Sequence, residues 1–267
     1  MSDQPHHRLI TIAASSIEEV VPVQTPRPLE VELCVATLAG VQVAAQIGAD
    51  RVELCQELQC GGLTPTPELV MQAWEFSQQH GLALRILVRQ LPDTFVHTPA
   101  QCAQLLEQIG QLRELVGDDD RVGFVTGALT DKREVDPVFL RECRAVAPAA
   151  AMVFHRAIDN TRNYLRSLEQ VRDAGFNAVL TTGQGPRANV TGLRLACTVL
   201  GPSTAVIGSG GLREDNIAHV VAGAGLQQVH FRAPDAEPDV TDGALAQAII
   251  NQVRPAQRCQ NHTDFVE

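Results

Sequence analysis

A short apolar run, a turn and a longer amphipathic stretch follow one another eight times along this chain, from Leu29 to Val253. The apolar runs predict strands over Leu29–Val35, Arg51–Cys55, Leu82–Arg89, Arg121–Leu129, Ala149–His155, Asn177–Gly183, Ser203–Gly211 and Gln227–Phe231. The amphipathic stretches predict helices over Thr37–Gly48, Pro67–His80, Pro99–Val116, Pro137–Val146, Arg162–Ala174, Val190–Leu200, Arg213–Ala222 and Thr241–Val253. Several of these stretches stop at Gly, which is typical of helix ends.

Strand and helix in strict alternation predict an α/β fold with a parallel sheet. Eight units of roughly 20–35 residues each fit a closed TIM-like (β/α)8 barrel in a single domain over residues 29–254. A doubly wound open sheet is the alternative, and the lack of a Gly-rich turn after the first strand argues against it. Residues 1–28 and 255–267 fall outside the repeat. We expect them to form an N-terminal extension, with a Pro/Thr-rich linker over 21–28, and a C-terminal tail.

Composition narrows the class of protein. The 267 residues are 45% hydrophobic, enough for a large core. The 7 Cys are few for this length and odd in number, which argues against a disulfide scaffold. A net charge of −10 without a Lys/Arg block argues against nucleic acid and anionic membranes as partners. No apolar run is long enough to span a bilayer, and residues 1–27 lack a signal-peptide pattern. We therefore expect a cytoplasmic protein with reduced thiols.

The predicted strands place polar residues inside the barrel. Alternate residues of a barrel strand face the lumen, and function gathers at the C-terminal strand ends. If the apolar residues pack under the helices, the lumen receives Glu32, Cys34, Glu53, Cys55, Arg85, Arg89, His155, Thr182 and His230. Asp159 follows shortly after His155 and adds to a polar cluster. Because buried charges are costly unless paired, such a set is more often retained for a site than for stability.

Two interpretations of the charged residues stay open. Glu32, Glu53 and Arg89 could form a structural ion-pair network that fills the barrel. Alternatively, they form an acid–base site, in which Glu32 or Glu53 is the general base, His155 an acid or proton relay, and Arg89 holds an anion.

Cys34 and Cys55 end neighbouring strands, and we expect them to lie at matching heights. Two thiolates at that spacing suit a soft ion such as Cu(I). The alternative is that both are small buried hydrophobes, the commoner fate of free Cys. No Cys/His spacing supports zinc.

Glycine-rich turns follow two late strands. Thr182-Gly183 comes after the sixth strand, and Ser209-Gly210-Gly211 after the seventh. Backbone N–H groups in such loops often hold phosphate in barrels, and Gly permits close approach. Plain tight turns are an equally good explanation.

A series of motifs runs from Leu29 to about Pro234. The motifs are Glu32-Leu33-Cys34-Val35, Gly48-Ala49-Asp50-Arg51-Val52-Glu53-Leu54-Cys55, Gly61-Gly62-Leu63-Thr64-Pro65, Gly127-Ala128-Leu129, Phe154-His155-Arg156-Ala157-Ile158-Asp159, Leu180-Thr181-Thr182-Gly183, Ser209-Gly210-Gly211 and Val229-His230. In their order and spacing, these motifs resemble a known family, the copper homeostasis protein CutC.

The resemblance implies a TIM-like barrel in the cytoplasm with a role in copper handling. The family's suggested Cu(I) ligands fall on Cys34 and Cys55. Its shared polar residues in the lumen fall on Glu32, Glu53, Arg89, His155 and Asp159.

The chain departs from the family pattern at three places. Ala36-Thr37 stand where the family has Asp-Ser, and Gln90-Leu91-Pro92-Asp93-Thr94-Phe95 replaces a loop with a second Arg and two glycines. His230-Phe231-Arg232 stands where the family tends to have small hydroxyl residues. If the family's loop binds an anion, this chain binds it differently or not at all.

Three functional hypotheses follow. The first, which we adopt, is a copper homeostasis protein that binds Cu(I) through Cys34 and Cys55. The second is an enzyme that acts on a small anionic or phosphorylated metabolite at Glu32, Glu53, Arg89, His155 and Asp159, with Thr182, Gly183, Ser209, Gly210, Gly211 and His230 binding the ligand. The third is an inactive barrel that acts through its surface. A homodimer is compatible with each, because barrels commonly pair through helical faces.

Overall fold

The computed structural model describes residues 28–254. The expected N-terminal extension and the C-terminal tail lie outside the described residues, Pro28 excepted.

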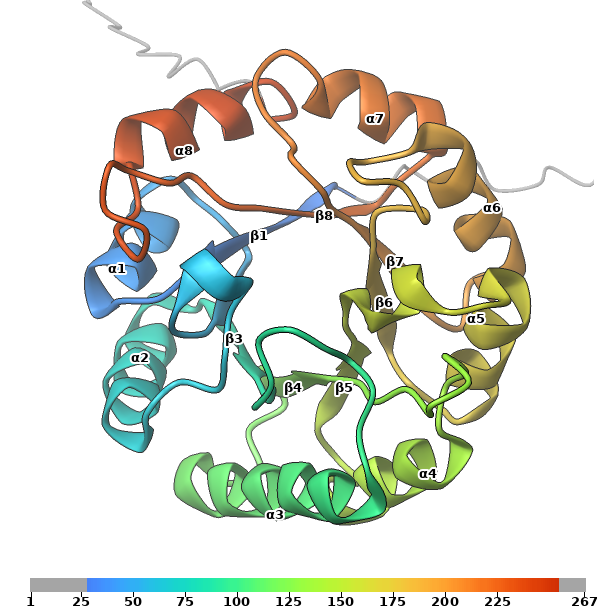
Figure 1. Cartoon of the computed structure of the whole chain (residues 1–267). Coiled ribbons are helices and arrows are strands. Elements are labelled where there is room, and N and C mark those ends of the chain that lie inside the picture. The colour runs from blue at the N-terminus through green and yellow to red at the C-terminus, as the bar shows by residue number, and fades with distance from the viewer. Residues whose placement is uncertain (1–27, 255–267) are drawn as a thin grey trace, which may run out of the picture.

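The eight strands close into one parallel barrel (Figure 1). Every strand pairs with the next in the sequence, and β1 pairs with β8 to complete the ring. The strands are β1 Glu30–Val35, β2 Arg51–Leu54, β3 Ala83–Leu87, β4 Val122–Thr126, β5 Ala151–Phe154, β6 Ala178–Thr181, β7 Ala205–Gly208 and β8 Gln228–Phe231. The predicted barrel is confirmed, and the open sheet is excluded.

Eight α-helices surround the strands in Figure 1. They are α1 Leu38–Gln46, α2 Pro67–His80, α3 Pro99–Val116, α4 Pro137–Val146, α5 Tyr164–Asp173, α6 Val190–Leu200, α7 Ile217–Ala224 and α8 Gly243–Asn251. The predicted bounds of α2, α3 and α4 agree with the structure. In each of them Pro opens the helix and the preceding residue, Thr66, Thr98 or Asp136, caps it through its side chain.

Three features of the connections differ from expectation. Helix α7 begins at Ile217 rather than Arg213, because the Arg213 N–H donates to the Asn216 side chain in a turn ahead of the helix. Two 3₁₀ turns, η1 Leu58–Cys60 and η2 Arg156–Asn160, were not expected. Both lie at the C-terminal end of the barrel, just after β2 and β5. No helix of residues 28–254 has the length and apolarity that a membrane span requires.

The strands separate two layers of apolar side chains. Val31, Leu33 and Val35 belong to the large core between the sheet and the helices. A second, smaller cluster occupies the lumen and comprises Cys34, Ala36, Cys55, Leu58, Leu87, Val125, Val153, Ala178, Leu180 and Ile207. The period-2 prediction for β1 and β2 is therefore confirmed, with Cys34 and Cys55 inside the barrel.

Helix α6 packs unusually close to the loop that precedes it. A Cβ at Gly192, in the first turn of α6, would lie 2.0 Å from the Gly183 carbonyl oxygen. Gly192 therefore fixes the position of the β6–α6 loop, which borders the C-terminal end of the barrel.

This contact predicts opposite effects of alanine at two helical glycines. Gly192→Ala should lower the free energy of unfolding by about 1–3 kcal/mol, because the added methyl group overpacks the loop. Gly110→Ala in α3 is the matched control, because a Cβ there meets its nearest atom, of Val146, only at 3.7 Å. It should raise stability by up to about 1 kcal/mol through helix propensity. Urea unfolding measures both, and equal effects would contradict the packing argument.

Candidate functional site

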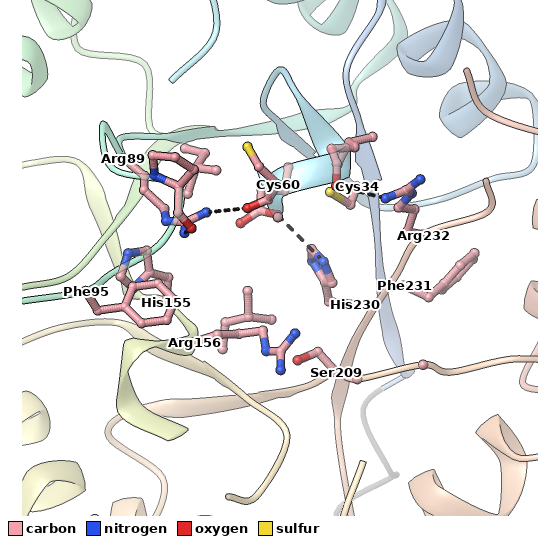
Figure 2. Close-up of a pocket in the computed structure, with 18 of the residues that line it drawn as sticks. Cys34, Cys60, Arg89, Phe95, His155, Arg156, Ser209, His230, Phe231 and Arg232 are labelled. Carbon is pink, nitrogen blue, oxygen red and sulfur yellow. Dashed lines mark hydrogen bonds and ion pairs between the residues drawn. The ribbon is translucent and has the colours of Figure 1, made fainter. Parts of the chain in front are cut away.

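A chamber of about 530 Å³ opens at the C-terminal end of the barrel. Figure 2 shows Cys34 and His230 on one side of it, and Arg89, Phe95 and His155 on the other. Strand ends β1, β2 and β8 supply the first side, and the segments after β3 and β5 supply the second.

Below the chamber, the carboxylate of Glu32 is 1% exposed and has two charged or polar partners. Arg51 on β2 donates through Nε, and His230 on β8 contacts the other oxygen through Nδ1 at 2.8 Å. Strand register produces this arrangement, since Glu32 lies opposite both Arg51 and His230. Arg51 also reaches Glu30 and Gln228.

Arg51 was not expected as the partner of Glu32, although it shares the lumen parity of Glu53. The ion pair at the centre of the barrel is therefore Glu32–Arg51 rather than a network that includes Arg89.

These contacts set the charges of three buried groups. Burial alone would raise the pKa of Glu32, but the charge of Arg51 and the bonds from His230 and Arg51 hold that pKa at about 2. Burial also acts to lower the pKa of His230, and Glu53, Cys34 and Glu32 together raise that pKa well above its usual value. Burial raises the pKa of Glu53. The lumen thus holds an ionised Glu32 beside a His230 that favours the imidazolium form.

Cys34, Glu53 and His230 form a set that could hold a metal ion. One ligand atom from each lies within 4.8 Å of the others. His230 Nε2 is 3.6 Å from Glu53 Oε2, while Nδ1 is engaged by Glu32. A second sulfur adjoins the set, because Cys55 Sγ is 3.8 Å from Cys34 Sγ.

The sequence predicted that Cys34 and Cys55 lie at matching heights, and this prediction is wrong. Cys34 is opposite Glu53, so Cys55 stands two residues further along its strand. Their side chains nevertheless meet, and Cys55 also directs its thiol to the Val35 carbonyl. Cys34 lines the chamber, whereas Cys55 is fully buried behind it. The bond with Cys55 and burial raise the pKa of the Cys34 thiol.

Arg89 lies just beyond β3 and lines the chamber. Its guanidinium donates to the carbonyls of Cys60, Gly62 and Pro92, and lies 5.0 Å from the centre of the Phe95 ring. These contacts occupy most of its donors and fasten the loop after β2 to the loop after β3. Arg85, also expected in the lumen, donates to the carbonyls of Leu84 and Arg121 and does not line the chamber.

His155 follows β5 and is 4% exposed. Its Nδ1 accepts a hydrogen bond from the Ala157 N–H, and its ring lies edge-on to Phe95 at 5.0 Å between centroids. Burial and the charge of Arg89 lower the pKa of His155 to about 3. The imidazole is therefore neutral, and its proton is on Nε2, which has no hydrogen-bond partner among residues 28–254.

Asp159 does not line the chamber with the other expected site residues. Its carboxylate accepts from the Thr181 hydroxyl and from the N–H groups of Thr182 and Gln184. It thereby holds the β6–α6 loop. Thr182 and Gly183, which were predicted to bind a ligand, belong to that loop and do not line the chamber. Leu180 of β6 lines it instead.

The remaining wall contains the Gly-rich loop and basic side chains. Ser209, Gly210 and Gly211, which were predicted to bind a ligand, line the chamber after β7. Arg156, Arg213 and Arg232 also line it. None of these three arginines was predicted as a site residue, because each follows a strand end, where the alternation of strand residues no longer applies.

The sequence that forms these elements matches a known family. Residues 29–234 match the model of the CutC family. The chain belongs to the CutC family. A CutC family protein of Bacteroides thetaiotaomicron is 31% identical over 205 residues, which cover 76% of this chain and 77% of the relative. The copper homeostasis protein cutC homolog of Caenorhabditis elegans is 32% identical over 166 residues, 62% of this chain and 64% of that protein.

Solved structures agree on the fold. A CutC protein of Streptococcus agalactiae superposes with a TM-score of 0.70 at 22% identity, covering 76% of this chain and 97% of that one. The thiamine phosphate pyrophosphorylase of Pyrococcus furiosus superposes with a TM-score of 0.57 at 13% identity, covering 85% and 96%. Both likenesses concern the barrel architecture.

The buried Glu32 contacts predict a large effect of a neutral replacement. Glu32→Gln should lower the free energy of unfolding by about 3–5 kcal/mol, because the buried guanidinium of Arg51 then loses its buried counter-ion and keeps only the half-exposed Glu30. Asp118→Asn is the matched control, since Asp118 pairs with Arg113 at the surface, where ion pairs contribute little. Urea unfolding at neutral pH compares the two variants. Similar losses would contradict the central role of Glu32.

His155 predicts a specific dependence of stability on pH. With a folded pKa of about 3 and an ordinary value of 6.5, only the unfolded chain takes up this proton as pH falls below 6.5. Between pH 7.5 and 5 this lowers the free energy of unfolding by about 2 kcal/mol. His155→Asn keeps an acceptor for the Ala157 N–H and removes the titration. It should therefore lose about 2 kcal/mol less than the wild type over this interval.

Urea unfolding at pH 7.5 and pH 5.0 measures the difference. His219→Asn is the control, because His219 is exposed on α7. The prediction is wrong if His155→Asn and the wild type lose the same stability on acidification.

Proposed function

We propose that this protein binds Cu(I) at the C-terminal end of the barrel and acts in copper homeostasis. The observation that carries the proposal is the meeting of Cys34, Glu53 and His230, with ligand atoms within 4.8 Å, and of Cys55 Sγ at 3.8 Å from Cys34 Sγ. Two sulfurs and an imidazole nitrogen are ligands that Cu(I) accepts.

The orientation of His230 supports a metal at this place. A metal-binding histidine usually donates its second ring N–H to a carboxylate, which fixes the ring and its tautomer. Glu32 occupies that position at Nδ1, at 2.8 Å, and Arg51 in turn holds Glu32. Nε2 then faces the group that contains Cys34 and Glu53, and it gives up its proton when a metal ion binds.

The second sulfur favours Cu(I) over a harder ion. Glu53 with Cys34 and His230 would also suit Zn²⁺, which accepts carboxylate oxygen. The thiol of Cys55, buried beside Cys34 and away from water, favours Cu(I) over Zn²⁺, because it adds a second soft sulfur ligand. We assign Cys34, Cys55 and His230 as the Cu(I) ligands, with Glu53 beside them.

The family and the state of the thiols support the same role. The relative from Caenorhabditis elegans is named a copper homeostasis protein. Cys34 and Cys55 are free thiols. Because Cu(I) coordination needs reduced cysteines, we place this function in the cytoplasm.

Removal of the two sulfurs tests the proposal. In an anaerobic, reducing titration against a chromophoric Cu(I) chelator, the wild type should bind one equivalent. Cys34→Ala with Cys55→Ala should weaken binding more than about a hundredfold, because two inner ligands are lost. Cys102→Ala with Cys197→Ala removes the same number of thiols from helices α3 and α6 and should leave the affinity unchanged. Equal binding by both double variants would overturn the assignment.

Single changes at the other two ligand candidates separate Cu(I) from Zn²⁺. His230→Gln should weaken both metals. Glu53→Gln should weaken Zn²⁺ and leave Cu(I) nearly unaffected, because a carboxylate is a poor ligand for a soft ion. A wild type that binds Zn²⁺ tightly and Cu(I) weakly would reverse the choice of metal.

A further inference from the structure

The chamber is far larger than a metal ion needs. Its volume of about 530 Å³ lies in the range of small-molecule pockets. Four arginines line it, Arg89, Arg156, Arg213 and Arg232, against a single carboxyl group, that of Glu53. The chain as a whole has a net charge of −10, so this concentration of positive charge is local. A concave site of one sign attracts ligands of the opposite sign.

Two of the four arginines keep terminal nitrogens free for a ligand. Arg89 and Arg232 both direct their terminal nitrogens to backbone carbonyls. Arg213 uses only one terminal nitrogen, on the carbonyls of Leu212 and Arg232. Arg156 has only a 3.7 Å ion pair with Asp159 among the described residues, and its side chain is 49% exposed.

The loop after β7 adds backbone donors beside these side chains. Ser209 N–H bonds to the Thr181 carbonyl, and the Gly210 carbonyl accepts from Ala188, which fixes the loop from outside the chamber. The N–H groups of Gly210 and Gly211 have no acceptor among residues 28–254. Both glycines have positive φ, 104° and 70°, a conformation that favours glycine, and their two successive free amides are donors from which an anion can accept hydrogen bonds.

The His155 side chain supplies a further hydrogen-bond donor, on the opposite side of the chamber from Cys34 and His230. His155 is only 4% exposed, and its Nε2 has no hydrogen-bond partner among the described residues. Figure 2 shows His155 beside Phe95 on one side of the chamber, with Arg156 pointing toward the loop of Ser209. A buried donor without an acceptor is costly, so a ligand in the chamber that accepts from this nitrogen gains a favourable hydrogen bond.

We propose that the chamber binds a small phosphomonoester, with its phosphate on the Gly210 and Gly211 amides and the free donors of Arg213 and Arg156. The ligand body then extends toward His155. Three terminal phosphate oxygens match donors that come from two loops, whereas a carboxylate is already satisfied by one guanidinium. The volume of the chamber suits a small molecule. This site goes beyond the proposed copper function and does not depend on it.

The test is a calorimetric titration of the metal-free full-length protein with inorganic phosphate. The wild type should saturate below about 10 mM phosphate. Arg213→Gln and Arg156→Gln should each weaken binding about tenfold, the effect of losing one charged hydrogen bond. Arg156→Gln keeps the result interpretable if Arg213→Gln perturbs its loop. Arg166→Gln, which changes an exposed arginine on α5, is the matched control and should bind as the wild type does.

Three results would contradict the proposed phosphate site. No saturation by the wild type below about 10 mM, or equal affinity in Arg156→Gln, Arg213→Gln and Arg166→Gln, would overturn the site. Glycerol 3-phosphate should bind more tightly than glycerate, and the reverse order would assign a carboxylate ligand instead. The Cys34→Ala, Cys55→Ala variant should keep its phosphate affinity. A failure of copper binding and a failure of this site are therefore distinguishable.

Discussion

The ionised carboxylate of Glu32 lies at the centre of the barrel, and the candidate site depends on its two partners. Burial acts against its charge, and Arg51 and His230 together offset that penalty. The three residues come from β2, β1 and β8, so one carboxylate joins the strands that close the ring. It also fixes the ring of His230, whose second nitrogen faces Cys34 and Glu53. The same contacts that make a buried acid tolerable therefore orient the candidate metal ligands.

Part of this arrangement can be predicted from the sequence, because it follows from periodicity. A period of 2 in β1 and β2 assigns Glu32, Cys34, Glu53 and Cys55 to the lumen, and the structure agrees. Helix bounds are predictable where Pro follows a capping residue, as in α2. The register between parallel strands is not encoded in one strand's pattern. The relative height of Cys34 and Cys55 was therefore predicted wrongly.

Residues beyond the strand ends could not be placed in this way. Loop side chains follow tertiary contacts rather than a period. Asp159 is a carboxylate close to His155 in the sequence and was therefore predicted as a site residue. It instead holds the β6–α6 loop by accepting hydrogen bonds from Thr181, Thr182 and Gln184. Arg89 lines the chamber but directs its donors to carbonyls. Conversely, nothing in the spacing of Arg156 and Arg213 indicated that both line one chamber.

Closure of the ring has a consequence for how this protein is made. Glu32 and His230 are 198 residues apart in sequence, and β1 obtains its second neighbour only from β8. During synthesis from the N-terminus, β1 leaves the ribosome with its acidic side chain long before that neighbour exists. Non-local pairing of this kind slows folding, because a long loop must close first. A nascent or truncated chain that ends before β8 thus contains Cys34 and Cys55 but lacks the imidazole of His230.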